Sequence, residues 1–423
     1  PAIHISRNEE GLNIAQVFVQ RTSEDSSAVA SEDPELDDGI RIFDEINLYA
    51  PRLSIVNGSV LTASDITYPE NLHLPGSLNI SHLNADLFLE ITDSQLFADI
   101  SNFSATLPDT PYQFVRIEGQ FYNDDRFFEV NGLNITTAEN ELDLSFEAQP
   151  VSLFSQNSSI REQFLDAEYR TTINSANFSN TFVRLFIPQF PNLDEQLSFE
   201  AQAEGTAQNF FIDRFQALFG ESAVIATATV ENIFSDEINY DAQIENIVLQ
   251  PDQFQWISDN YLNQFDTALY QSAIIRGDLT GNYQETNGDL NIETEAGSLM
   301  LDLLMNYREE PEYELLAEVD SLNISLILKD SVTTTRLNGR IALAGSGFDK
   351  SAAITGSFDF SGSTIRDFDF QQIIAEADYS NEQLNYSVQL GDEFGSLQAS
   401  GRYIEGSAYP EFSVEGSLQN FNF

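Results

Sequence analysis

The sequence lacks cysteine altogether and is poor in basic residues: Lys329 and Lys350 are its only lysines, and 18 Lys and Arg stand against 68 Asp and Glu. Without cysteine, the chain cannot form disulfides, thiolate nucleophiles or cysteine-ligated zinc sites. A formal net charge of −50 excludes a surface that neutralises nucleic-acid phosphates, and it disfavours docking on anionic lipid headgroups. No apolar run reaches the about 18 residues that a membrane-spanning helix needs.

Motifs for catalysis are also missing. The three histidines are His4, His73 and His82, and the last two lie nine residues apart, which is not a spacing of metal ligands. There is no G-x-S-x-G motif, and LAGSGFDKS at 343–351 lacks the glycine that directly precedes the lysine of a phosphate-binding loop. We therefore expect a protein that is not an enzyme and that uses no metal or cofactor.

What the sequence does contain is an alternation of apolar and polar residues. In ELDLSFEA at 141–148 and QLSFEAQAE at 196–204, apolar residues occupy every second position and polar or acidic residues fill the others. This period is typical of antiparallel strands with one buried and one solvated face. Helical periodicity is rare, and it predicts only short helices near 158–167, 182–190 and 252–265.

The strands recur as an internal repeat. Val130 aligns with Ile212 at an offset of 82 residues without a gap, and the GSL stretches that begin at Gly297 and Gly395 look like one strand repeated. Later copies end in a slip of the alternation by one residue, as in IENIVL at 244–249, which predicts a β-bulge or bend.

These repeats define the expected domain organisation. The chain begins at Pro1 without Met, so we expect a fragment of a longer protein, from which a signal or anchor has been cut away. We place an amino-terminal strand pair with an acidic, mobile loop at 1–38, and repeats at 39–112, 113–195, 196–271, 272–335 and 336–423.

The apolar faces of so many strands need a cover, and the sequence offers few helices to supply it. A Leu or Phe left in water forgoes ~1.5–3 kcal/mol, so a bare sheet would be prohibitive. The sheet can close on itself as a sandwich or solenoid, the copies can stack face to face, or the sheet can form a trough that is filled by acyl chains. The periodicity alone does not choose among these solutions.

The amino-terminal part resembles a known family. GLNIAQVF at 11–18 is followed by IRIFDEINLYAPRLSIVNGSVLTASDITYP at 40–69, which includes Gly58, Val60 and Asp65. This arrangement resembles the amino-terminal region of TamB-like proteins of the AsmA superfamily, and the later glycine-bearing strands are similar to the repeats of that family. The resemblance covers nearly the whole chain, through patterns of apolar residues and glycine.

The resemblance implies a mainly β fold: an elongated repeat array of antiparallel strands that forms a curved, groove-like sheet, with a few short helices at the links between repeats. It also implies a periplasmic, bridge-like groove that transfers phospholipid between the inner and the outer membrane and so supports outer-membrane biogenesis. The full-length protein would be anchored in the inner membrane through a segment absent from this chain.

Three alternatives accompany this hypothesis. The first is a subunit of a translocation and assembly module that aids insertion of outer-membrane proteins together with an Omp85-type outer-membrane barrel. The second is a structural or adhesive β-solenoid without a ligand. The third is a polysaccharide-degrading β-solenoid enzyme, which the two lysines and the lack of a clustered catalytic set disfavour. In the groove hypothesis, phospholipid acyl chains slide over an apolar floor while headgroups stay in water. The expected groove-lining residues are Leu142, Leu144, Phe146, Leu197, Phe199, Ala201, Val224, Ala226, Leu299 and Leu301.

The acidic composition itself generates a prediction. Acid-rich, lysine-poor surfaces suit proteins in concentrated salt, which screens their self-repulsion. A halophilic source explains this composition, and so does a merely soluble acidic protein. If the source is halophilic, the melting temperature should rise markedly between low and molar salt; a melting temperature that does not depend on salt would contradict that explanation.

Overall fold

The structure is a computed structural model in which most of the chain after residue 46 is described. The described residues are 2–5, 7–8, 11–12 and 47–419, apart from 63–78, 109, 111–112, 156–158, 187–195, 236–237, 251–271, 308–310, 328–333, 348–351, 367, 393–394 and 405–410. The expected helix at 252–265, most of the expected acidic loop and the histidine at 73 lie outside these residues. Within them, no helix is both long and apolar enough to span a membrane.

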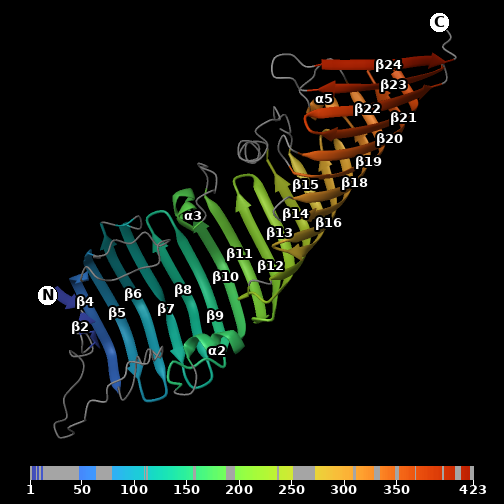
Figure 1. The fold of residues 1–423 in the computed structure, drawn as a ribbon. Coiled ribbons are helices and arrows are strands. Elements are labelled where there is room, and N and C mark those ends of the chain that lie inside the picture. The colour runs from blue at the N-terminus through green and yellow to red at the C-terminus, as the bar shows by residue number, and fades with distance from the viewer. Residues whose placement is uncertain are drawn as a thin grey trace. The chain divides into compact units, whose positions relative to one another are not determined.

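The chain divides into two compact units, residues 1–220 and 221–423. The first unit is an antiparallel sheet in which each strand from β4 to β12 pairs with its neighbours in sequence (Figure 1). The short β1 (Ala2–Ile5) runs parallel to β4, and β2 (Arg7–Asn8) pairs with β3 (Gly11–Leu12). The strands of the main sheet are β4 (Leu48–Thr62), β5 (Asn79–Ile91), β6 (Leu96–Leu107), β7 (Gln113–Asn123), β8 (Phe128–Thr137), β9 (Glu141–Gln149), β10 (Glu168–Phe178), β11 (Leu197–Thr206) and β12 (Asn209–Phe219).

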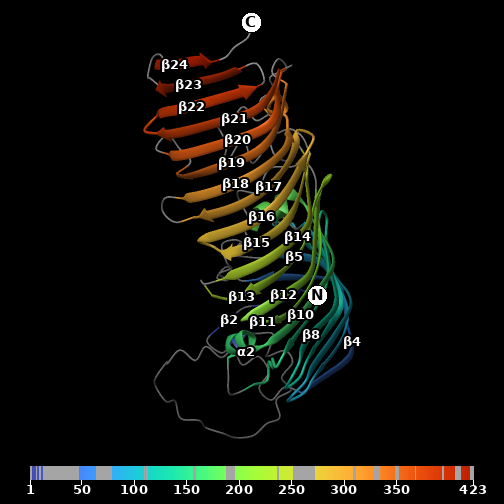
Figure 2. The same ribbon diagram turned by 90° about the vertical axis from the view of Figure 1, so that its right-hand side faces the viewer.

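The second unit again consists of antiparallel strands that pair in sequence order. Its strands twist and bend along their length, so this sheet is curved rather than flat (Figure 2). The strands are β13 (Ser222–Glu231), β14 (Asn239–Leu249), β15 (Ala273–Asn282), β16 (Glu285–Thr294), β17 (Gly297–Asn306), β18 (Glu312–Leu322), β19 (Thr335–Ser346), β20 (Ala353–Ile365), β21 (Phe368–Ser380), β22 (Gln383–Asp392), β23 (Gly395–Ile404) and β24 (Glu411–Gln419).

The expected strand pattern is confirmed. ELDLSFEA forms β9, and its apolar residues alternate with Asp143, Ser145 and Glu147 along a strand without a bulge. Two of the predicted slips, at 244–249 and 319–324, are bulges, because the register shifts by one residue between Ile244 and Ile247 in β14 and between Val319 and Leu322 in β18. A third slip, predicted at 418–423, lies mostly outside the described residues. At each bulge, one extra residue shifts the alternation, so that the next apolar residue lies on the apolar face again.

Short helices accompany the sheets. α2 (Ile160–Asp166) falls within the predicted helix at 158–167, and it begins with a capping box. The backbone N–H of Glu162 donates to Ser159 Oγ at 3.2 Å, and the backbone N–H of Ser159 donates to the Glu162 carboxylate at 2.9 Å. α3 (Asn180–Phe186) begins two residues before the predicted helix at 182–190, and α5 (Ile324–Ile327) is a single turn.

Glycines in the first strands of the repeats permit close approach between strands. Gly339 in β19 has a φ of +150°, and a Cβ added there would overlap the backbone of Asp359 and Phe360 in β20. Gly391 in β22 is the opposite case, since no atom lies within 4 Å of its hypothetical Cβ. The conformation and the close contact at Gly339 therefore require glycine, whereas Gly391 has room for a side chain.

This difference predicts the effect of substitution. Gly339→Ala should destabilise the second unit by ~1–3 kcal/mol, because it combines a strained φ with a backbone clash. Gly391→Ala should change stability by less than ~1 kcal/mol, and in the stabilising direction if it changes at all. Urea unfolding of the two variants measures the difference. Equal midpoints would show that the close approach at β19 is not required.

Candidate functional site

One face of the second unit is built from continuous rows of side chains. Because β17 has no bulge, Leu299, Leu301, Leu303 and Met305 project from the same face of the sheet. The strand registers extend each of these positions into a row that crosses all twelve strands from β13 to β24, one residue per strand. We call these four rows together the apolar floor.

The two outer rows of the floor differ in composition. The row through Leu299, which we call the aliphatic row, contains Val224, Ile247, Ile275, Ile292, Leu299, Val319, Gly339, Phe360, Ile373, Leu390, Leu397 and Leu418. The row through Met305, which we call the tyrosine row, contains Val230, Tyr240, Gly281, Thr286, Met305, Tyr313, Gly345, Ile354, Tyr379, Leu384, Tyr403 and Phe412.

The two inner rows consist of small and large apolar residues and one tyrosine. The row through Leu301 contains Ala226, Ile244, Gly277, Leu290, Leu301, Ala317, Ile341, Phe358, Ala375, Val388, Ala399 and Gly416. The row through Leu303 contains Ala228, Ala242, Leu279, Gly288, Leu303, Leu315, Leu343, Gly356, Ala377, Tyr386, Gly401 and Val414.

None of the 48 positions in these four rows of twelve carries Asp, Glu, Lys, Arg or His, although 20% of the whole sequence is Asp, Glu, Lys or Arg. Among the residues that the structure describes, no second sheet packs over the floor. The leucines on the floor side of β17 and β18 are half-buried by their neighbours, whereas Leu304 and Leu316 on the other face are exposed. The floor is therefore apolar, continuous and only partly covered by the described chain.

The first unit has a related surface. Rows that pass through Leu142, Phe146 and Ala148 of β9 each cross the nine strands from β4 to β12, and none of their 27 positions is charged. Asn123 and Thr171 are the non-aromatic polar residues of these rows. A fourth row, through the remaining apolar residue of β9, is interrupted at the bulge between β7 and β8.

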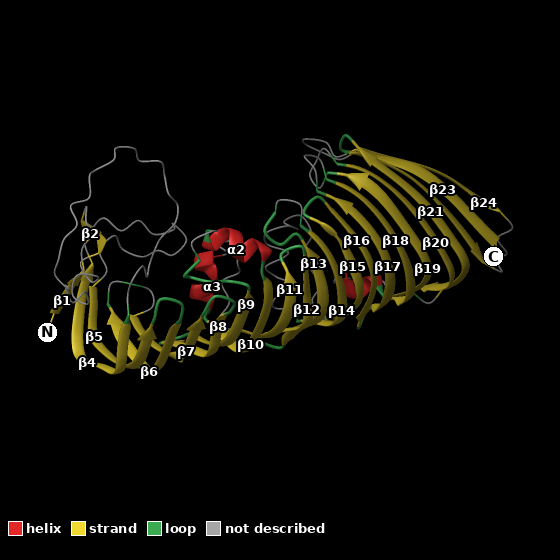
Figure 3. Ribbon diagram, turned by 90° about the horizontal axis from the view of Figure 1, so that it is seen from below, coloured by secondary structure: helices red, strands yellow, loops and turns green. Residues whose placement is uncertain are grey.

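Short helices cover two parts of this surface in the first unit (Figure 3). Phe164 of α2 contacts Phe128 and Tyr169, with ring centroids 5.8 and 6.4 Å away, and joins a cluster in which Phe146 also packs. Phe182 of α3 stacks on Phe178, with ring centroids 5.0 Å apart. The helices therefore replace water over these aromatic side chains.

The structure places all ten sequence-predicted lining residues on the apolar face of their own unit. Val224, Ala226, Leu299 and Leu301 belong to the apolar floor of the second unit, as the rows above show. In the first unit, the registers and the regular alternation of β9 and β11 align the predicted residues on one face: Leu142, Leu144, Phe146, Leu197, Phe199 and Ala201. Their contact with a lipid stays a prediction.

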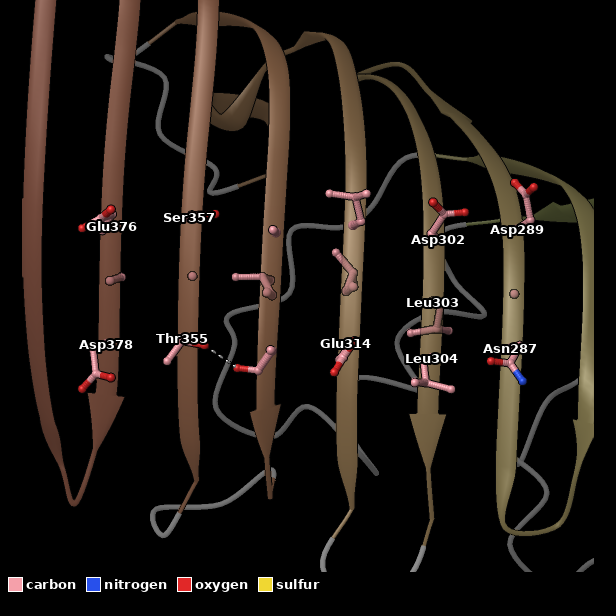
Figure 4. A pocket seen from close by; sticks show the side chains of 18 of the residues that line it. Asn287, Asp289, Asp302, Leu303, Leu304, Glu314, Thr355, Ser357, Glu376 and Asp378 are labelled. Carbon is pink, nitrogen blue, oxygen red and sulfur yellow. Dashed lines mark hydrogen bonds between the residues drawn. The ribbon is translucent and has the colours of Figure 1, made fainter.

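A hollow in the second unit lies on the opposite, polar face. It has a volume of ≈ 1070 Å³ and crosses β15 to β22. On most of these strands it is lined by the two polar-face residues on either side of the row through Leu303, such as Asp302 and Leu304 of β17, and by the row residue between them. Neither Leu301 nor Met305 of the floor lines it, so it opens on the polar side. Carboxylates from neighbouring strands extend into it (Figure 4), and its six acidic lining residues are Asp278, Asp289, Asp302, Glu314, Glu376 and Asp378.

The arginines on the described strands from β4 to β24 also belong to the polar faces. Arg340 forms an ion pair with Glu318 at 2.8 Å, and the exposed side chains of both residues limit its energetic value. In the first unit, the guanidinium of Arg52 donates two hydrogen bonds to Asp86, which lower the pKa of that carboxyl. Charge is thereby segregated from the apolar rows in both units.

Side chains for chemistry are not brought together in the described part of the chain. No group of three or more His, Asp or Glu residues is arranged to hold a metal ion there. His82 makes a structural contact, with its Nδ1 2.9 Å from Asn57 Oδ1. No family model, curated protein or solved structure matches this chain.

The apolar surface under α2 in the first unit and the uncovered floor of the second unit should respond differently to substitution. Phe146→Asp should destabilise the first unit by several kcal/mol, on the order of the ~3–5 kcal/mol of a deleted core aromatic, because it places a carboxylate in the cluster under α2. Leu301→Asp on the apolar floor should cost no more than the ~2 kcal/mol of one lost apolar contact surface. Thermal unfolding compares the two variants. Complete unfolding of Leu301→Asp would show that the floor is sealed in the folded chain.

Proposed function

We propose that this protein shields the acyl chains of lipids on its apolar floor and serves as a groove for phospholipid transfer. The observation that carries the proposal is the exclusion of charge from all 48 floor positions of the second unit. A charged side chain facing acyl chains would lose its hydration without gaining a partner, so a lipid-bearing surface must exclude it.

The dimensions of the floor suit acyl chains. Positions two residues apart on a strand are about 6.8 Å apart, so four rows span about 20 Å, and twelve strands at about 4.8 Å cover about 50 Å. The hydrocarbon of one bilayer leaflet is about 15 Å thick, half of the about 30 Å core. The width therefore accommodates one extended acyl chain, and the length accommodates several lipids side by side.

Burial supplies the driving force. At ~25 cal/mol per Å² of apolar surface, a guest chain that covers half-buried leucines stabilises both itself and the sheet. The carboxylates of the polar hollow do not oppose this, because they face away from the floor. They keep the opposite surface hydrated and repel further copies of the sheet.

The location of transfer follows the family resemblance. The proposed setting is the periplasm, with phospholipid passing between the inner and the outer membrane along a full-length protein that is anchored in the inner membrane. A closed solenoid with a dry core does not fit the open, one-layer sheet that is described in each unit. The groove hypothesis is therefore the function that the geometry supports best.

Adjacent leucines on opposite faces provide a matched test. Leu303 and Leu315 are paired neighbours on the floor, whereas Leu304 and Leu316 are the next residues of the same two strands on the polar face. The double variant Leu303→Asp/Leu315→Asp should retain roughly tenfold less phospholipid, since the unpaired carboxylates cost at least the ~1.4 kcal/mol that corresponds to tenfold in affinity. The double variant Leu304→Asp/Leu316→Asp should retain as much as the unmodified chain.

Mass spectrometry of lipids extracted from the purified proteins measures retention, and circular dichroism checks that both variants are folded. Equal retention by the two double variants would contradict the proposal. So would the absence of any phospholipid from the unmodified chain after incubation with vesicles.

A further inference from the structure

The two margins of the apolar floor differ chemically. The aliphatic row presents only hydrocarbon side chains and one glycine. Three of its residues, Val319, Phe360 and Ile373, form a buried cluster with Leu322 and Leu337 beside the row, and Ile324 of α5 packs against this cluster. Between β18 and β21, this margin is therefore closed by the protein's own apolar side chains.

The tyrosine row forms the other margin, where the strands end in turns. Four of its twelve residues are tyrosines, namely Tyr240, Tyr313, Tyr379 and Tyr403, and Thr286 adds a further hydroxyl. The hydroxyls of Tyr240 and Thr286 lie 2.7 Å apart. Tyrosine combines an apolar ring with a polar tip, which suits it to a boundary between hydrocarbon and water.

Glycines allow these rings to lie along the sheet. A Cβ added to Gly345 would come within 2.8 Å of the hydroxyl of Tyr313, the preceding member of the tyrosine row, so that ring extends over the glycine. Gly281 separates Tyr240 from Thr286 in the same row. The rings of Tyr240 and Tyr313 thus extend along the margin and keep their hydroxyls there. Burial raises the pKa of Tyr313, so its hydroxyl keeps its proton and can donate.

We propose, building on the lipid-shielding function, that the tyrosine row is the headgroup margin and that acyl ends point towards the aliphatic row. The floor takes lipids whose headgroups carry no net negative charge, because its donors are neutral hydroxyls and it holds no cation. The acids of the polar face further disfavour an anionic headgroup.

A labelling experiment tests the orientation, and the absence of cysteine makes single labelling sites simple. Leu299 and Met305 lie on one strand, six residues or about 20 Å apart. The variants Leu299→Cys and Met305→Cys, each carrying a bimane fluorophore, are mixed with phosphatidylcholine that bears a nitroxide on either the headgroup or the acyl end. Leu304→Cys on the polar face is the control.

We expect headgroup nitroxide to quench the label at 305 at least about twofold more than the label at 299. Acyl-end nitroxide should quench the label at 299 more. The two sites are distinguishable because they lie about 20 Å apart, which is farther than the reach of nitroxide quenching. Equal or inverted quenching at the two floor sites would overturn the orientation while leaving the shielding function intact. If neither site is quenched more than position 304, the shielding function itself fails.

The headgroup class is tested by competition at molar salt, where long-range repulsion is screened. Unlabelled phosphatidylcholine vesicles should relieve the quenching several-fold more effectively than phosphatidylglycerol vesicles of the same acyl composition. Phosphatidylglycerol that competes equally well or better would overturn the exclusion of anionic headgroups.

Discussion

A one-layer sheet with one apolar face must have that face covered, and the other features of this structure follow from that requirement. In the first unit, α2 and α3 cover two aromatic clusters, with Phe164 and Phe182 as the covering side chains. In the second unit, Ile324 of α5 packs against the apolar cluster at one margin between β18 and β21, and neighbouring side chains bury one another only in part. A bound acyl chain would cover the apolar surface that remains, because burial of apolar surface is the largest favourable contribution to its binding free energy.

The second property of this surface is that it carries no charged residue. Asp302 and Leu303 are adjacent in β17, yet Asp302 lies on the acidic polar face and Leu303 belongs to the uncharged floor. Packing alone does not require that every charged residue be excluded from the floor, since a long side chain such as lysine can extend its charge into water from a half-buried position. A floor that must remain in contact with mobile hydrocarbon tolerates no such exception, because each charge would interrupt the path of the chain.

Much of the fold could be predicted from the sequence, because the alternation of residues assigns faces strand by strand. It placed Leu142 and Leu299 on apolar faces, and the slip at 244–249 identified a bulge that the register confirms. Alternation says nothing of how strands align with one another, so the tyrosine row could not be predicted. Tyr240 and Tyr403 belong to the same row only through the successive registers of the strands between them. The cover of α2 over Phe146 was missed for the same reason, because contacts between distant segments leave no periodic signal.

The registers also explain why the bulges and the strained glycines matter for function. A slip of one residue in any strand would exchange its two faces and bring acids such as Asp289 or Glu314 onto the floor. The bulge in β18 prevents this by returning Leu322 to the face of Val319 after Asp320 and Ser321. Gly339 lets the next strands approach at the same level, so the row continues from Val319 to Phe360. The uncharged surface thus stays continuous over twelve strands because of bulges and strained glycines. A sheet that needed only local packing would have no reason to repeat these features.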